Sequence, residues 1–109
     1  RLLERAGLYP NVHVVDVAGQ VELWVVDGVR VGEDTLKVEQ YGGLVGIDGL
    51  HFSDTAYALV ANLFIEEIAR VLDAEVPPID IASIWAQDRE RPERLKADGL
   101  DLDACSNFP

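Results

Sequence analysis

A long apolar stripe between residues 53 and 72 sets the strongest limit on how this chain can fold. Its members recur three or four positions apart, the spacing that places side chains on one face of an α-helix: Tyr57, Val60, Ala61, Phe64, Ile68, Val71 and Leu72. Ser53 suits the N-cap position and Asp54 suits the first turn, whereas Pro77 and Pro78 cannot continue a helix. The sequence therefore predicts a helix of about five turns that buries this stripe.

Residues 12–17 form an apolar run of strand length. The run is Val-His-Val-Val-Asp-Val, rich in β-branched residues, and it is apolar enough for both faces to be buried, as in the central strands of a parallel sheet. Residues 1–7 precede it with helical spacing and a terminal glycine suited to a C-cap. A helix, a short turn and a buried strand make an αβ unit, so the expected fold class is α/β.

Residues 20–40 predict a small β-hairpin inserted into this scaffold. Asp27-Gly28 separates two β-branched runs, at residues 23–26 and 29–31, and this pair is typical of a two-residue type I′ turn. A further turn at residues 32–34 predicts a third short strand at residues 35–38. Trp24 on this hairpin fits a packing role or the wall of a substrate cleft.

The composition excludes several classes of partner and site. The chain has 109 residues, enough for one domain or part of one, and its net charge of −11 argues against nucleic acid and anionic membranes as partners. No stretch is long and apolar enough to span a membrane. The single cysteine, Cys105, excludes an internal disulfide and a cysteine-based metal cluster, and it does not fix the compartment. We expect no cofactor.

The C-terminal third gives little evidence of a site. Ile81, Ile84 and Trp85 have helical spacing and are expected to dock a short segment onto the body. The charged stretch from residue 88 onward is expected to be a solvated tail. Its aspartates at positions 98, 101 and 103 lack the glycine and the terminal glutamate of a calcium loop, so no metal site is predicted there.

Asp48 and His51 are the candidate catalytic residues. They lie three positions apart in the glycine-punctuated stretch at residues 46–54, directly before the predicted helix. A histidine that removes a proton needs its ring fixed in one tautomer, and a carboxylate in the same turn can accept from its Nδ1–H and leave Nε2 free. The same spacing also fits a hydrogen bond at a helix start that has no chemical role.

For the other candidate site residues, a structural role is possible as well as a functional one. His13 lies inside the predicted strand, where a histidine is usually structural. Asp16 lies near the end of that strand, where ligand sites of parallel sheets occur, but it also fits a helix or turn cap. Ser53 is best explained as the cap of the long helix.

The context of Asp48 and His51 resembles a known family. Residues 48–53 read Asp-Gly-Leu-His-Phe-Ser, residues 56–57 read Ala-Tyr, and residues 60–65 read Val-Ala-Asn-Leu-Phe-Ile. This stretch, about a fifth of the chain from Gly43 to Ile65, is similar to the last conserved block of the SGNH, or GDSL, hydrolases. That block reads Asp-Gly-(Ile/Val/Leu)-His-Pro-Ser, then Gly-Tyr, then an alanine-rich helix. Phe52 replaces the usual proline and Ala56 the usual glycine.

The resemblance implies a fold and an activity. These hydrolases are esterases and lipases with a flavodoxin-like three-layer α/β/α fold. Residues 1–76 would then be the C-terminal part of such a domain, with residues 12–17 as its last core strand and residues 77–109 as an extension or tail. Asp48 would be the orienting acid and His51 the general base of a Ser-His-Asp triad that acts on a small-molecule ester.

The nucleophile that the resemblance requires has no counterpart in the sequence. The family's serine lies in a Gly-Asp-Ser block near its N-terminus, and none of the serines here, at positions 53, 83 and 106, follows a strand on a nucleophile turn. The chain contains no methionine and begins at Arg1, so we expect a C-terminal piece of a longer protein. The strand at residues 12–17 should then pair with the missing N-terminal part or with a second copy. The alternative is a non-catalytic acidic module that binds a protein partner.

Overall fold

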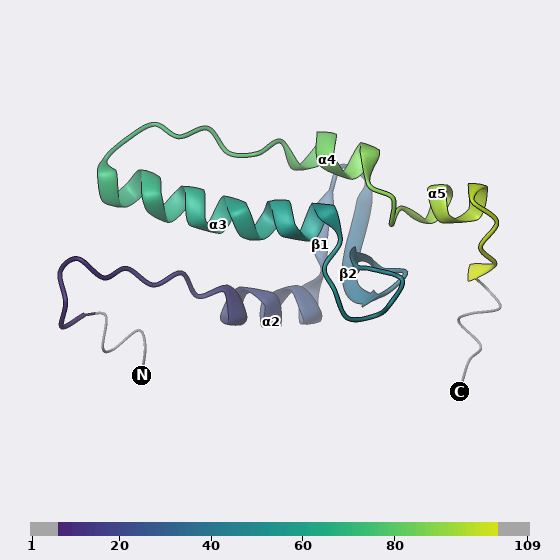
Figure 1. The fold of residues 1–109 in the computed structure, drawn as a ribbon, viewed down its shortest axis with the longest axis horizontal. Helices are drawn as coiled ribbons and strands as arrows, with labels where there is room; N and C mark the ends of the chain where they lie inside the picture. Colours follow the sequence, from purple (N-terminus) through teal and green to yellow (C-terminus); the bar gives the residue numbers. More distant parts are fainter. Residues whose placement is uncertain (1–6, 103–109) are drawn as a thin grey trace.

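The computed structural model describes residues 7–102, and they form a mixed α/β structure (Figure 1). The described elements, in chain order, are α2 (Val17–Asp27), β1 (Val29–Val31), β2 (Asp34–Gln40), β3 (Gly43–Val45), α3 (Asp54–Leu72), α4 (Ile81–Gln87) and α5 (Pro92–Ala97). The expected α/β class is confirmed. The predicted helix at the N-terminus falls on residues 1–6, which lie outside the described residues.

Helix α3 has the boundaries that the sequence predicts. The Ser53 hydroxyl accepts a hydrogen bond from the Ala56 amide at 3.2 Å and so caps the first turn. The helix ends at Leu72, before the two prolines, and Asp73 closes it in the left-handed conformation with φ of 47°.

The burial of α3 differs from the prediction. Most of the apolar stripe is exposed: Tyr57 is 53% exposed, Phe64 46%, Ile68 47% and Leu72 67%. The buried residues of α3 lie near its N-terminus, where β3 and α4 contact it. The predicted burial of the stripe is wrong for this chain because the described elements cover only one end and one side of the helix.

The strand predicted at residues 12–17 is also wrong in this structure. Residues 12–16 have no regular secondary structure, and Val17 begins α2. Asp16 caps that helix by accepting a hydrogen bond from the Gly19 amide at 3.0 Å. A strand needs a neighbouring strand for its backbone groups, and the described sheet consists of β1, β2 and β3 without residues 12–16.

Helix α2 replaces the first strand of the predicted hairpin. Gly28 ends this helix with φ of 71°, and its amide donates to the Trp24 carbonyl at 2.8 Å. An Asp-Gly pair fits a helix C-terminus as well as a type I′ turn. The hairpin forms one turn later, where β1 pairs antiparallel with β2 through residues 32–33, and the predicted strand at residues 35–38 is confirmed within β2.

The small sheet has the order β1-β2-β3, with β3 parallel to β2 and an irregular register between Lys37 and Gln40. Gly43 enters β3 with φ of 104°, and a Cβ at this position would lie 3.0 Å from the Leu36 side chain and 3.0 Å from the Trp85 ring. Only glycine fits there without displacing the core. This close approach seats β3, and the segment that follows it, directly on the core.

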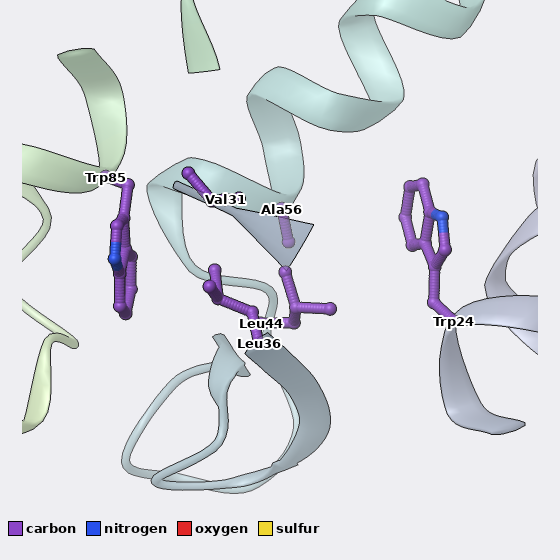
Figure 2. Close-up of a cluster of buried hydrophobic side chains, with 6 residues drawn as sticks. All are labelled: Trp24, Val31, Leu36, Leu44, Ala56 and Trp85. Atoms are coloured by element: carbon purple, nitrogen blue, oxygen red, sulfur yellow. The ribbon is translucent and has the colours of Figure 1, made fainter. Parts of the chain in front are cut away.

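The core is a cluster of six buried side chains, three from helices and three from the strands of the sheet. Figure 2 shows the indole rings of Trp24 from α2 and Trp85 from α4 on either side of smaller aliphatic groups. Those groups are Val31, Leu36, Leu44 and Ala56. Trp24 therefore packs in the core, as one of its two predicted roles requires.

The C-terminal third is more ordered than predicted. The docking of α4 onto the body is confirmed, since α4 contacts α3, the Trp85 side chain is buried and its indole donates to the Asp34 carboxylate of β2 at 2.9 Å. The prediction of a solvated tail from residue 88 is wrong at Asp88, which is 1% exposed, and at Leu95 in α5, which is 6% exposed. None of the described helices combines the length and the apolar character needed to cross a bilayer.

Candidate functional site

Residues 46–53 form a loop whose two ends are fastened together between β3 and α3. The Gly46 amide donates to the His51 carbonyl at 2.7 Å, and the Ser53 amide donates to the Leu44 carbonyl at 3.0 Å. These two hydrogen bonds join the start of the loop to its end. The candidate residues are therefore carried by a closed turn that stands directly on the first turn of a 19-residue helix.

Asp48 organises the tip of this loop through its carboxylate. Its Oδ1 accepts from the Leu50 amide at 2.9 Å and from the His51 amide at 3.1 Å. This is the local bonding that makes aspartate favourable in turns. Gly49 takes φ of 69° at the tip, a conformation that glycine adopts readily.

The other carboxylate oxygen of Asp48 lies against the imidazole. Asp48 Oδ2 is 2.6 Å from His51 Nδ1, while the His51 side chain is 71% exposed. The hydrogen bond from His51, followed by the two backbone hydrogen bonds, lowers the pKa of Asp48 from 3.8 to about 2. The predicted contact between the two side chains is confirmed, and their catalytic role stays a prediction.

The contact also fixes the tautomer of His51. A carboxylate with such a low pKa is ionised near neutral pH and can only accept hydrogen bonds, so Nδ1 must carry the proton. In the neutral ring Nε2 then holds the free lone pair. Because the ring is exposed, a reacting group can approach that nitrogen, and the pair can act as an oriented general base.

The remaining sequence candidates lie elsewhere or serve the fold. His13 lies near Glu67 of α3, with 3.9 Å between His13 Nδ1 and Glu67 Oε1. The buried Ser53 hydroxyl donates to the Gly43 carbonyl at 2.7 Å in addition to its capping bond. The Ser83 hydroxyl donates to the Asp80 carboxylate at 2.7 Å. Neither hydroxyl is placed to act as a nucleophile for His51, and Ser106 lies outside the described residues.

Two residues that sequence reasoning missed bind the peptide groups of Ile47, which directly precedes Asp48. The Gln40 amide nitrogen donates to the Ile47 carbonyl at 2.5 Å. The Glu90 carboxylate accepts from the Ile47 amide. Glu90 lies in the stretch that the sequence predicts as tail, and nothing in its local sequence signals a contact 43 positions away.

Glu90 adds negative charge beside the loop. Burial raises the pKa of Glu90 above its usual 4.5, and repulsion from Asp88, Asp48 and Asp54 adds to the rise. The hydrogen bond from the Ile47 amide opposes it. This carboxylate is therefore held close to the candidate pair in spite of an unfavourable electrostatic environment.

An apolar groove lies one turn along α3 from the loop. It has a volume of about 400 Å³ and is lined by Asp54, Tyr57, Ala58, Ile79, Ile84 and Gln87. Tyr57 also contacts Phe52, the residue after His51, with ring centroids 5.8 Å apart in an edge-to-face arrangement. The aromatic pair thus links the candidate loop to the wall of the groove.

The described residues 7–102 contain no group of three or more histidine, cysteine, aspartate or glutamate side chains placed to hold a metal ion.

No protein-family model matches this chain, and neither a curated protein nor a solved structure matches it. The geometry of Asp48 and His51 is therefore the main evidence on which a function can be proposed.

Proposed function

We propose that this chain supplies the acid and the base of a Ser-His-Asp triad in an ester hydrolase of the SGNH, or GDSL, type. The observation that carries the proposal is the 2.6 Å contact between His51 Nδ1 and Asp48 Oδ2, beneath an exposed imidazole. The sequence around the pair supports the family, since it resembles that family's last block in motif, cap and helix.

In this mechanism His51 moves a proton twice. Its Nε2 accepts the proton of a serine hydroxyl while the serine oxygen attacks the ester carbonyl, and it then gives that proton to the leaving alcohol. Water hydrolyses the acyl-serine by the same route in reverse. Asp48 stays ionised and stabilises the imidazolium that forms between the two transfers.

The nucleophile in this proposal comes from protein outside the chain, namely the N-terminal part of the same polypeptide. The exposed stripe of α3 supports a missing neighbour. The chain also exposes 7964 Å² of surface, whereas a compact monomer of this length exposes about 6,000 Å². In the completed protein, residues 1–76 would belong to the C-terminal part of a flavodoxin-like domain.

The substrate class that fits is a small ester with an apolar acyl chain. The groove lined by Tyr57, Ile79 and Ile84 offers an apolar wall close to the loop. The Phe52–Tyr57 pair connects that wall with the residue next to His51.

The test uses a longer polypeptide that includes residues upstream of Arg1 and a short-chain chromogenic ester. His51→Ala should lower kcat/KM at least about a thousandfold, because the base is lost from a triad that acts as a unit. His13→Ala is the matched control, since it removes the only other histidine and should leave the rate unchanged. A loss within about threefold for His51→Ala, or no hydrolysis by the parent protein, rules the proposal out.

A second candidate function is a non-catalytic acidic module that binds a protein partner. The exposed stripe of α3 favours it, because apolar patches of this kind mark interaction surfaces. In that case the Asp48–His51 contact serves only the loop. The two functions separate in the same assay, since the binding module retains its partner and shows no ester hydrolysis in any longer form.

A further inference from the structure

The turn after α4 reaches the start of α3 through a buried carboxylate. Asp88 Oδ2 accepts from the Thr55 amide at 2.9 Å and from the Thr55 hydroxyl at 2.5 Å, and both residues are buried. The first amides of a helix have no partner within the helix. Asp88 therefore acts as a second cap for α3, beside Ser53, from 33 positions away.

The same carboxylate fixes the position of Glu90. Asp88 Oδ1 accepts from the Glu90 amide at 2.9 Å, and the Arg91 amide donates to the Asp88 carbonyl at 3.3 Å. The turn so formed directs Glu90 toward the loop. Glu90 Oε1 lies 3.5 Å from the position that a Cβ on Gly46 would occupy, and the carboxylate accepts from the Ile47 amide.

Ile47 is thus held on both sides by side chains from outside the loop at residues 46–53. Glu90 binds its amide and Gln40 binds its carbonyl. The next residue is Asp48, whose carboxylate must point at His51 Nδ1 for the tautomer to be fixed. The amides of Leu50 and His51 hold one oxygen of that carboxylate, and the orientation of the Ile47 backbone sets where the Asp48 side chain begins.

We propose that Glu90, fixed by Asp88, is a positioning residue for the Asp48–His51 pair. It anchors the backbone leading into Asp48, and so it keeps the proton of His51 on Nδ1 and the lone pair on Nε2. The inference rests on the proposed function for its effect on catalysis. Its effect on the imidazole is independent of any reaction and can be measured on this chain by itself.

The direct measurement is the ratio of the two neutral tautomers of His51, obtained from its ring ¹⁵N chemical shifts in the 109-residue chain. Glu90→Ala should lower the ratio of the Nδ1–H to the Nε2–H form at least about threefold, because the anchor of Ile47 is lost. Glu90→Gln should restore most of the ratio, because its side-chain oxygen can still accept from the Ile47 amide. Glu93→Ala is the matched control, since Glu93 is exposed and pairs only with Arg91 among the ion pairs described.

A second variant tests the same point without touching a partly buried group. Gln40→Ala releases the carbonyl of Ile47, and since Gln40 is exposed the chain should remain folded. It should shift the ratio in the same direction. An unchanged ratio in both Glu90→Ala and Gln40→Ala overturns the proposal.

The longer polypeptide separates this inference from the proposed function. If it hydrolyses esters, Glu90→Ala should lower kcat and leave KM within about twofold, since a misplaced base affects the transition state more than binding. If it hydrolyses no ester while the ratio still shifts, the proposed function fails and the positioning role stands. If it hydrolyses esters while the ratio and kcat do not change, only the positioning role fails.

Discussion

At the scale of single residues, two carboxylates near the same loop have pKa values that are shifted in opposite directions. Asp48 is stabilised as an anion by hydrogen bonds from His51 and the backbone. Glu90 is disfavoured as an anion by burial and by neighbouring negative charge. An ionised Asp48 can only accept hydrogen bonds, so it holds the His51 proton on Nδ1 throughout the neutral pH range.

The first prediction concerns Asp48. Its folded pKa lies below the unfolded value of 3.8, so the stability it contributes is fully present above about pH 3.8 and is lost as the pH falls through about 2. A ¹³C titration of the Asp48 carboxyl should give a midpoint near 2. His51→Ala should move that midpoint back toward 3.8, and a midpoint near 3.8 in the parent chain contradicts the hydrogen bond.

The second prediction concerns Glu90 and has the opposite sign. Its folded pKa is raised, so the stability contributed by its protonated form is present below about pH 4.5 and is lost as the pH rises through the folded pKa. Glu90→Gln should therefore raise the melting temperature at pH 7 and have little effect at pH 4. Glu93→Gln serves as the control on an exposed carboxylate. A lower melting temperature for Glu90→Gln at pH 7 would show that the charge is favourable.

At the scale of elements, the N-terminus of α3 depends on a buried cap from a distant turn. Asp88→Ala leaves the amide and hydroxyl of Thr55 buried without their acceptor, which should cost about 2–4 kcal/mol of unfolding free energy. Asp80→Ala, which removes the exposed cap of α4, should cost only about 1 kcal/mol. Urea denaturation of both variants measures the difference, and equal losses would mean that the Asp88 contact is no stronger than a surface cap.

The elements that could be predicted from sequence are those fixed by local signals. Ser53, the helical period and the two prolines define α3 without reference to the rest of the chain. Asp48 and His51 lie three residues apart in a glycine turn, so their contact is local as well. Residues 12–17 and the Asp27-Gly28 pair have no such signal. The valines before Asp27 fit a strand or a helix, and the burial of Trp24 against the sheet favours the helix α2, while residues 12–16 remain without regular structure.

Most of the contacts that could not be predicted join segments far apart in the chain. Asp88 and Glu90 belong to an acidic stretch whose composition is that of a solvated tail, and only the fold brings them to Thr55 and Ile47. The prediction that the α3 stripe is buried is wrong for a related reason. Periodicity shows that a face is apolar, but it does not show which part of the protein covers it.

At the scale of the whole molecule, the chain is extended and leaves apolar surface uncovered. Its radius of gyration is 16.6 Å, compared with about 13 Å for a compact domain of this length. Figure 1 shows α3 running out beyond the sheet, and the exposed residues Phe64, Ile68 and Leu72 fall in the C-terminal half of this helix. This uncovered surface is what the proposed missing part would cover.

The fourth prediction tests that surface. Ile68→Lys should change the unfolding free energy of this chain by less than about 0.5 kcal/mol, because the side chain is 47% exposed. In the longer polypeptide the same substitution should lower the unfolding free energy several-fold more, because the stripe would be buried there. Leu59→Lys is the control, since Leu59 packs against the core and should destabilise both forms. An equally small effect of Ile68→Lys in both forms would show that nothing covers the stripe.

The most direct test of the Asp48–His51 pair as a catalytic unit is a double-mutant cycle on ester hydrolysis by the longer polypeptide. If the two residues act together on one serine, adding Asp48→Asn to His51→Ala should lower kcat no further than His51→Ala alone. If the two losses multiply, or if neither variant slows hydrolysis, the contact at 2.6 Å belongs to the loop and not to a reaction.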